Sequence, residues 1–216
     1  MTNRDSRKEP AFSRDQIAAT LAPFGATLSG AQLEAIETYV RLLLIWNRSI
    51  NLTALEDPLE IVARHFGESM FAASVIPMRS GRLADVGSGA GFPGMALKIA
   101  IPDLDIVLIE SNRRKCAFLA EVKDSLGLNG VAIIRERYEE WHIESNSFDF
   151  ICSRAIGNYR SLIRWGANVL RRTGVVVLWL GTEDSTLIGK APGWNWRVPM
   201  PIPDSRRRVI LCGSAK

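Results

Sequence analysis

The spacing of apolar and polar positions divides the chain into two parts. Over residues 1–80, apolar side chains recur every three or four positions, which predicts amphipathic helices. Two of these helices begin with a capping-box pattern, formed by Ser13 with Gln16 and by Ser29 with Gln32. Beyond this region, short apolar runs alternate with helical patterns. That alternation predicts a mostly parallel sheet that is covered by helices on both faces.

The boundaries of these patterns define the predicted elements. Three helices are expected at residues 13–23, 30–46 and 57–75, with a loop over 47–53. The predicted strands and helices then alternate as strands 83–86, 106–109, 131–134, 148–152 and 175–180 and helices 93–100, 113–126 and 159–170. Two last runs, 194–198 and 206–212, predict an antiparallel hairpin at the sheet edge. The sequence thus predicts an α/β fold with an N-terminal helical extension, 1–80, and a nucleotide-binding domain, 81–216.

A glycine-rich segment, LADVGSGAGFPG at residues 83–94, joins the first predicted strand to its helix. Gly87, Gly89 and Gly91 lie in the loop, and Pro93 suits the first helical turn because its missing N–H would be unpaired there. Glycine permits positive φ angles and the close approach of a ligand that a Cβ would block. Unobstructed N–H groups beside a helix N-terminus favour the polar part of a nucleotide.

Glu110 ends the next apolar run. A carboxylate at that strand end can accept both hydroxyls of a ribose, which predicts a cofactor that contains adenosine. The sequence leaves two cofactors open. Residues 89–94 satisfy the dinucleotide pattern GxGxxG. The pattern GxGxG that directly follows Asp85 and Val86 is typical of the S-adenosyl-methionine loop of class I methyltransferases, and the register of the strand favours this second interpretation.

Composition and charge narrow the class of protein. The chain has 216 residues, of which 47% are hydrophobic and 23% charged, as in an ordinary globular protein. No apolar run approaches the ~18 residues of a membrane span. Cys116, Cys152 and Cys212 are widely spaced, which indicates reduced core thiols in a cytoplasm. His65 is interpreted as a hydrogen-bonding core residue, so no metal site is assigned.

The net charge of +4 is unevenly distributed. Residues 1–81 hold 8 basic and 9 acidic side chains, whereas residues 82–216 hold 19 basic and 14 acidic ones. This asymmetry favours a polyanionic partner such as a nucleic acid, although solvated helix faces can give the same count.

Six segments between residues 39 and 181 together resemble one family, the bacterial 16S ribosomal RNA guanine-N7 methyltransferases long called glucose-inhibited division protein B. The segments are LLLIWNRSINLTAL (42–55), ARHFGESM (63–70), DVGSGAGFPG (85–94), IESNRRKCAFL (109–119), RYEEW (137–141) and SRAI (153–156). The resemblance implies a class I, Rossmann-like methyltransferase fold with a terminal antiparallel hairpin, and S-adenosyl-methionine as the cofactor.

The resemblance also implies roles for individual residues. Gly87, Gly89 and Phe92 would line the methionine and adenosine portions of the cofactor, and Glu110 would hold its ribose. Tyr138 and Glu139 match the pair beside the adenine. The family often has alanine at Tyr138, so only backbone contacts there would be shared.

A second group of residues would act on the substrate. Arg154 matches an arginine close to the cofactor or the guanine, and we assign it the catalytic role. Arg113, Arg114 and Lys115 would contact RNA phosphates. The implied substrate is N7 of a guanine in the decoding region (530 loop) of 16S ribosomal RNA, free or in a small-subunit precursor. A monomer in the cytoplasm is expected.

Guanine N7 carries a lone pair and no proton, so its methylation requires positioning but no general base. Two other functions remain open from the residues: a Rossmann-type oxidoreductase that binds NAD, and a non-catalytic RNA-binding or ribosome assembly factor on the same fold. A comparison of the thermal stabilisation by S-adenosyl-methionine with that by NADH tests the oxidoreductase alternative. A methyl-transfer assay tests the non-catalytic alternative.

Overall fold

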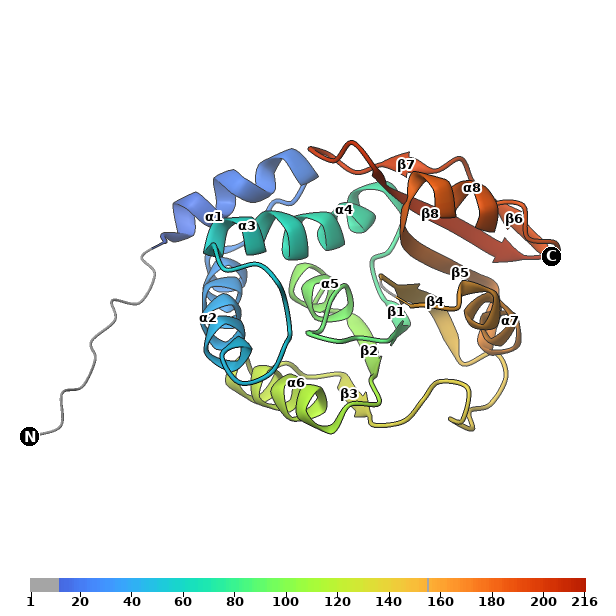
Figure 1. The fold of residues 1–216 in the computed structure, drawn as a ribbon, viewed down its shortest axis with the longest axis horizontal. Coiled ribbons are helices and arrows are strands. Elements are labelled where there is room, and N and C mark those ends of the chain that lie inside the picture. The colour runs from blue at the N-terminus through green and yellow to red at the C-terminus, as the bar shows by residue number, and fades with distance from the viewer. Residues whose placement is uncertain (1–11, 155) are drawn as a thin grey trace, which may run out of the picture.

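The computed structural model describes residues 12–154 and 156–216, so Ala155 of the SRAI segment lies outside the described residues. Within these residues an eight-stranded sheet has the order β3-β2-β1-β4-β5-β8-β6, and β7 pairs with β8 (Figure 1). The strands are β1 (Gly81–Val86), β2 (Leu104–Ile109), β3 (Val131–Ile134), β4 (Phe148–Ser153), β5 (Leu170–Gly181), β6 (Trp194–Trp196), β7 (Met200–Pro201) and β8 (Arg208–Ala215).

Strands β1 to β5 are parallel, and the strand order reverses at β1, which has β2 on one side and β4 on the other. β8 runs antiparallel to β5 and to β6, which confirms the predicted hairpin. In open α/β sheets, ligands bind beyond the carboxyl ends of the strands at the point where the order reverses. The topology therefore places a candidate site beyond the carboxyl ends of β1, β2 and β4.

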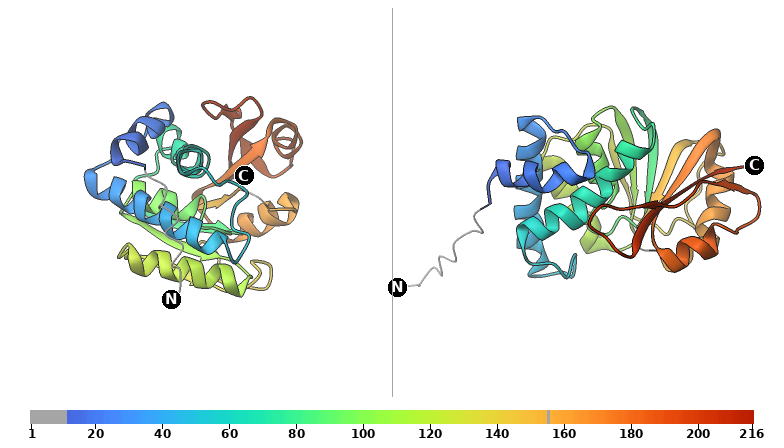
Figure 2. Two further views of the ribbon diagram at one scale, coloured as in Figure 1. Left: turned by 60° about the vertical axis from the view of Figure 1, so that its left-hand side comes forward. Right: turned by 90° about the horizontal axis from the view of Figure 1, so that it is seen from above.

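Helices cover both faces of the sheet (Figure 2). α5 (Gly94–Ala100) and α6 (Arg113–Ser125) pack on one face, and α7 (Tyr159–Val169) and α8 (Thr182–Ile188) pack on the other. Because side chains alternate along a strand, Leu83 joins the first core and Ala84 the second. The central strands are hydrophobic on both faces for this reason.

The N-terminal helices pack over the α5 and α6 side of the sheet. They are α1 (Arg14–Leu21), η1 (Ala22–Phe24), α2 (Gly30–Asn47) and a continuous run of α3 (Pro58–Ile61), η2 (Val62–Gly67) and α4 (Glu68–Val75). Both capping boxes are formed. The Tyr39 hydroxyl of α2 donates to the Ala90 carbonyl at 2.6 Å, which ties this region to the glycine loop. No described helix is long and apolar enough to cross a membrane.

Three features of the structure differ most from the predicted elements. β5 begins at Leu170, five residues before the predicted start, because α7 ends at Val169. The predicted helix over 57–75 contains a π-helical turn, η2, a feature common at functional sites. Helix α8 was not predicted: its seven residues are too few for a clear apolar periodicity, and only Ser185 and Ile188 of the helix are buried.

Candidate functional site

The glycine loop leaves β1 with three residues in left-handed backbone conformations. The φ angles of Gly87, Gly89 and Gly91 are 73°, 57° and 86°. A Cβ at Gly87 would find no atom within 4 Å, and one at Gly89 would find only the Gly87 carbonyl oxygen at 3.8 Å. A Cβ at Gly91 would instead collide with the Tyr39 hydroxyl. The first two glycines therefore border open space, whereas the third is required by packing.

Glu110 brings its carboxylate to this loop. It lies directly after β2 and is 8% exposed. One carboxylate oxygen accepts the Gly89 N–H at 2.9 Å, and the other accepts the Asn112 N–H at 2.8 Å. Each oxygen keeps a second lone pair, so the group is oriented and can still accept hydroxyl donors. The structure thus brings together Gly87, Gly89 and Glu110, as the sequence predicted.

Asp85, the acidic residue before the loop, has a structural role. It is fully buried and accepts the Gly94 N–H at 3.0 Å at the start of α5. The thiol of Cys152 lies 3.7 Å from its other oxygen. Burial raises the pKa of Asp85 to about 7, although the hydrogen bond from Gly94 opposes this shift. Its carboxylate fixes the direction of α5 from inside the sheet.

Phe92 lies among aromatic rings and is 7% exposed. It stacks on His65 with ring centroids 4.8 Å apart, and on Tyr39 at 5.4 Å. The Nε2 atom of His65 is 2.7 Å from the Thr53 hydroxyl, which fits the interpretation of His65 as a hydrogen-bonding core residue. Burial lowers the pKa of His65 to about 3, so the ring is neutral at pH 7. Phe92 joins the loop to the N-terminal helices.

Tyr138 and Glu139 follow β3, and their side chains differ in burial. The Tyr138 side chain is buried and packs edge-on against Trp165 of α7, with ring centroids 5.6 Å apart. Glu139 is exposed. The phenol of Tyr138 therefore belongs to the second core, which leaves its backbone as the part that could meet a cofactor.

Arg154 directly follows β4, and its partner is a buried carboxylate. Its Nη2 atom lies 3.5 Å from Oε2 of Glu68 in α4. Glu68 is 2% exposed and also pairs with Arg64 and Arg208. Burial raises the pKa of Glu68, and the three guanidinium groups oppose this shift. The sequence reasoning gave Glu68, Arg64 and Arg208 no role. The i,i+4 spacing of Arg64 and Glu68 was a usable signal, whereas nothing local marks Arg208.

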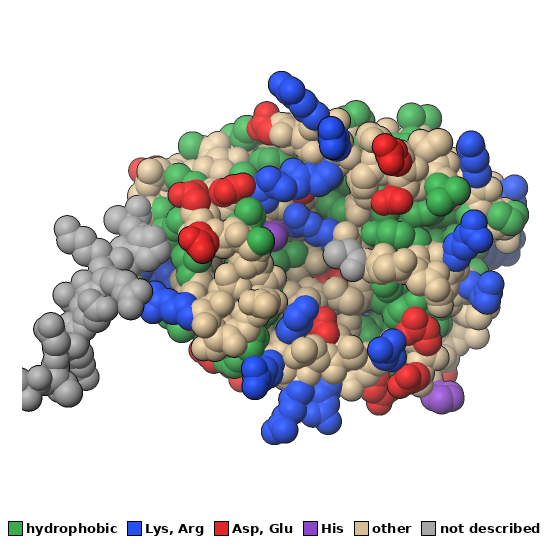
Figure 3. Space-filling model, in the orientation of Figure 1, with side chains coloured by type: hydrophobic (Ala, Val, Ile, Leu, Met, Phe, Trp, Pro, Cys, Tyr) green, Lys and Arg blue, Asp and Glu red, His purple; other side chains and the backbone are tan. Residues whose placement is uncertain are grey.

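Three basic residues begin α6 beside Glu110. Asn112 caps this helix by accepting the N–H groups of Arg114 and Lys115. Arg113 and Arg114 are exposed, and Figure 3 shows Lys and Arg side chains gathered over α6. Cations at a helix N-terminus oppose the helix dipole, and within the described residues these three form no ion pair. An anionic partner would compensate them.

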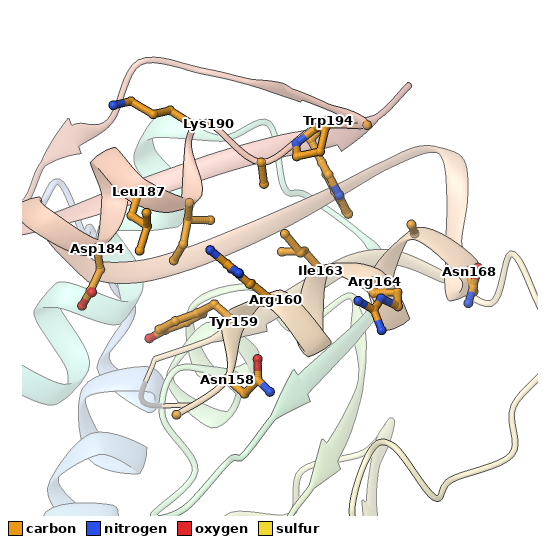
Figure 4. Close-up of a pocket in the computed structure, with 16 residues that line it drawn as sticks. Asn158, Tyr159, Arg160, Ile163, Arg164, Asn168, Asp184, Leu187, Lys190 and Trp194 are labelled. Atoms are coloured by element: carbon orange, nitrogen blue, oxygen red, sulfur yellow. The ribbon is translucent and has the colours of Figure 1, made fainter.

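A wide groove lies away from the glycine loop, between α7 and α8. It measures about 930 Å³ and is lined by Tyr159, Arg160, Asp184, Lys190 and Trp194, among others (Figure 4). None of the glycine-loop residues lines it. This volume belongs to an open groove between two surface helices, away from the glycine loop and Glu110.

Together, the strand order, the antiparallel β8 and the glycine loop facing Glu110 define a class I, Rossmann-like methyltransferase. Solved structures support this fold. The TM-score is 0.60 with a ribosomal protein L11 methylase from Lactobacillus delbrueckii subsp. bulgaricus, at 17% identity over 71% of this chain and 79% of that one. It is 0.59 with a SAM dependent methyltransferase from Aquifex aeolicus, at 13% identity over 69% and 90%.

The chain belongs to the rRNA small subunit methyltransferase G family, whose model matches residues 32–191. It is 34% identical to the ribosomal RNA small subunit methyltransferase G of Herminiimonas arsenicoxydans, over 89% of this chain and 91% of that protein. It is 38% identical to the protein of the same name from Syntrophus aciditrophicus, over 75% and 69%. The family named from the sequence is confirmed, and the oxidoreductase alternative is not favoured.

Proposed function

We propose that this protein transfers a methyl group from S-adenosyl-methionine to N7 of a guanine in the decoding region (530 loop) of 16S ribosomal RNA. The observation that carries the proposal is the open space over Gly87 and Gly89 beside the oriented carboxylate of Glu110. Membership of an rRNA small subunit methyltransferase family supports the substrate class. The substrate is free 16S RNA or a small-subunit precursor, and the enzyme acts as a cytoplasmic monomer.

The residues present fit this cofactor. A side chain at Gly87 or Gly89 would enter the open space over the loop, which is the arrangement that a closely approaching ligand requires. Glu110 has two free acceptor positions for the two ribose hydroxyls. Phe92 would close the loop side of the pocket, and the backbone of Tyr138 and Glu139 would border the adenine.

Bound S-adenosyl-methionine supplies a methyl group that is already activated by its positive sulfur. The protein has to hold the guanine in line with that group and exclude other orientations, and positioning of this kind can lower a barrier by roughly 7–11 kcal/mol. N7 has no proton to remove, so no side chain needs to act as a base. Arg154, directly after β4 and paired with Glu68, would position the guanine or the cofactor.

Arg113, Arg114 and Lys115 would bind RNA phosphates. Their place beside Asn112 and Glu110 lies next to the proposed cofactor loop, so RNA held there would reach the carboxyl ends of the strands. Arg114 and Lys115 line a surface hollow of about 380 Å³ together with Ser49 and Asn51. Their charges compensate RNA phosphates rather than any carboxylate of the described chain.

The test uses ribosomal RNA from a strain that lacks this protein. N7-methylation makes the guanine cationic and labile, so reduction followed by aniline cuts the strand at the modified nucleotide. Purified protein with S-adenosyl-methionine should create one strong cut in 16S RNA. The Arg154→Ala variant should lose this cut, and its affinity for the cofactor then shows whether Arg154 serves the guanine or the cofactor. Label that enters carbon, ribose or protein, without an aniline-sensitive guanine, would refute the proposal.

A further inference from the structure

Glu68 lies at the centre of an arginine cluster, which we define as Arg64, Arg154 and Arg208. The cluster joins three distant parts of the chain: η2, the residue after β4, and the first residue of β8. One carboxylate oxygen, Oε1, is 3.3 Å from Nε of Arg64 and 2.7 Å from Nη2 of Arg208. The other oxygen, Oε2, meets Arg154 at 3.5 Å. One carboxylate therefore orients three guanidinium groups.

The charges of this cluster are not balanced. Three guanidinium groups face one buried carboxylate, and the neighbouring His65 ring is neutral because burial lowers its pKa to about 3. Arg64 also lies 3.6 Å from Glu60, which is half exposed. Among the described residues, Arg154 and Arg208 pair with no carboxylate other than Glu68. An excess of positive charge remains, and an anion would neutralise it.

Some of the donors are also unused. Nη1 of Arg154 is buried without a hydrogen-bond partner, and Nε of Arg64 makes no hydrogen bond despite its ion pair with Glu68. Buried polar groups in folded proteins are normally satisfied, and charged donors are especially costly to leave without acceptors. An acceptor on the guanine or the cofactor would satisfy the Arg154 donor, and a phosphate would reach the cluster through its more exposed members, Arg64 and Arg208.

Exposure separates the cluster into an outer pair and an inner member. The side chains of Arg64 and Arg208, the outer pair, are 42% and 30% exposed, whereas that of Arg154 is 19% exposed. The outer pair shares Oε1 of Glu68, so its two guanidinium groups converge on one point. Figure 3 shows Lys and Arg side chains over α4 in the middle of the molecular face.

The cluster adjoins the proposed cofactor loop. His65, which follows Arg64 in the chain, stacks on Phe92 of the loop at 4.8 Å. Arg154 extends β4, which pairs with β1, the strand that leads into the loop. A nucleotide that entered the loop region from the RNA would bring its own backbone past the outer pair.

We propose that Arg64 and Arg208 bind one RNA phosphate next to the target guanine, and that Glu68 is the positioning residue that aligns them. This inference rests on the proposed function and assigns the phosphate to a site separate from residues 113–115. Guanidinium groups match phosphate oxygens in pairs, and two groups that one carboxylate oxygen holds side by side can share a single phosphate. The inner Arg154 stays available for the guanine or the cofactor.

The test measures binding of a 16S RNA fragment as a function of salt concentration. The logarithm of the affinity falls with the logarithm of salt by roughly 0.7–0.9 for each phosphate that the protein neutralises. Arg64→Gln and Arg208→Gln should each weaken RNA binding about 10-fold to 100-fold with little change in slope, because the remaining guanidinium still neutralises the shared phosphate. The double variant should reduce the slope by roughly one contact, since it removes both charges from that phosphate.

Arg206→Gln is the matched control, since Arg206 is exposed, carries the same charge and lies two residues before Arg208 outside the cluster. It should keep most of the wild-type affinity and slope. An equal effect of Arg206→Gln would overturn the proposal in favour of a general charge effect. A slope reduced by two contacts in the double variant would also overturn it, since that requires two phosphates. In the double variant, weakened binding of S-adenosyl-methionine with an unchanged RNA slope would assign the anion to the carboxylate of the cofactor instead.

Glu68→Gln separates positioning from charge. This variant keeps all three arginines, so the salt slope should stay near the wild-type value while KM for RNA rises at least tenfold and cofactor affinity is preserved. A variant that folds with unchanged KM would refute the positioning role. The proposed function is judged separately by the aniline cut. If the wild-type protein makes no cut, the proposed function fails. If it makes the cut but the Arg64 and Arg208 variants bind RNA as the wild type does, only this inference fails.

Discussion

Adding a single methyl group at Gly87 or at Gly91 should separate cofactor binding from folding. Both residues have left-handed φ angles, 73° and 86°, in the same loop. A Cβ at Gly87 would enter open space, whereas a Cβ at Gly91 would meet the Tyr39 hydroxyl and lie 2.9 Å from Cγ of Met95. Gly87→Ala and Gly91→Ala are therefore a matched pair with the same backbone strain and opposite surroundings.

The geometry sets the expected magnitudes. Holding alanine in the left-handed region costs roughly 1–2 kcal/mol, and this applies to both variants. Overpacking adds about 1–3 kcal/mol at Gly91 alone. Displacement of Tyr39 there also endangers its hydrogen bond to the Ala90 carbonyl, which contributes about 0.5–1.5 kcal/mol. We therefore expect a loss of unfolding free energy of about 1–2 kcal/mol for Gly87→Ala and about 2.5–6.5 kcal/mol for Gly91→Ala.

Urea unfolding measures the stability of each variant, and calorimetry measures its affinity for S-adenosyl-methionine. Gly87→Ala should remain folded and lose at least a factor of ten in affinity, because its methyl group occupies the space over the loop. Gly87→Val should abolish binding. Wild-type affinity in folded Gly87→Ala protein would show that the cofactor does not approach the loop at this residue. A larger loss of stability at Gly87 than at Gly91 would contradict the packing argument.

Three further predictions concern Glu110, residues 113–115 and Asp85. Glu110→Ala should weaken S-adenosyl-methionine binding by roughly 1–3 kcal/mol in calorimetry, and unchanged affinity would place the ribose contacts elsewhere. Charge reversal of residues 113–115 should lower the salt dependence of RNA binding and spare cofactor affinity; an unaltered slope would assign them to a solvated helix face. The pKa of Asp85 is raised to about 7 in the folded state, so the folded protein holds this proton more tightly than the unfolded chain does. The resulting stabilisation should be fully present below pH 4 and lost as the pH rises towards 7. Asp85→Asn should flatten that decline in urea unfolding, and a retained decline would assign it to other groups.

Much of the fold could be predicted because local signals and the final structure agree. The capping boxes at Ser13 and Ser29 are complete within four residues, so no distant contact can move these helix starts. The central strands are short apolar runs bounded by loop residues, and β2 and β3 are seen within two residues of their predicted bounds. The start of β5 was harder to predict, since Arg171, Arg172 and Thr173 are exposed and polar although they belong to the strand.

The candidate site was predictable where a role depends on backbone position. Gly87, Gly89 and Glu110 follow strand ends, and the parallel order of the sheet brings those ends together. The direction of a side chain is set by tertiary packing, which explains why the phenol of Tyr138 could not be placed from the pattern. The arginine cluster around Glu68 was missed for a related reason: Arg64 and Arg208 are 144 residues apart in the chain, and only the assembled sheet brings Arg208 to α4.

The inner position of β8 has a consequence for the nascent chain. Every other described element leaves the ribosome before β8, yet β8 lies between β5 and β6 in the sheet. Until it is made, residues 176–181 of β5 present an unpaired edge, which is a template for pairing with another chain. A copy that is truncated before residue 208 would carry the glycine loop but would have an open sheet and no Arg208 partner for Glu68. Unfinished copies should therefore aggregate or be degraded before they can engage RNA.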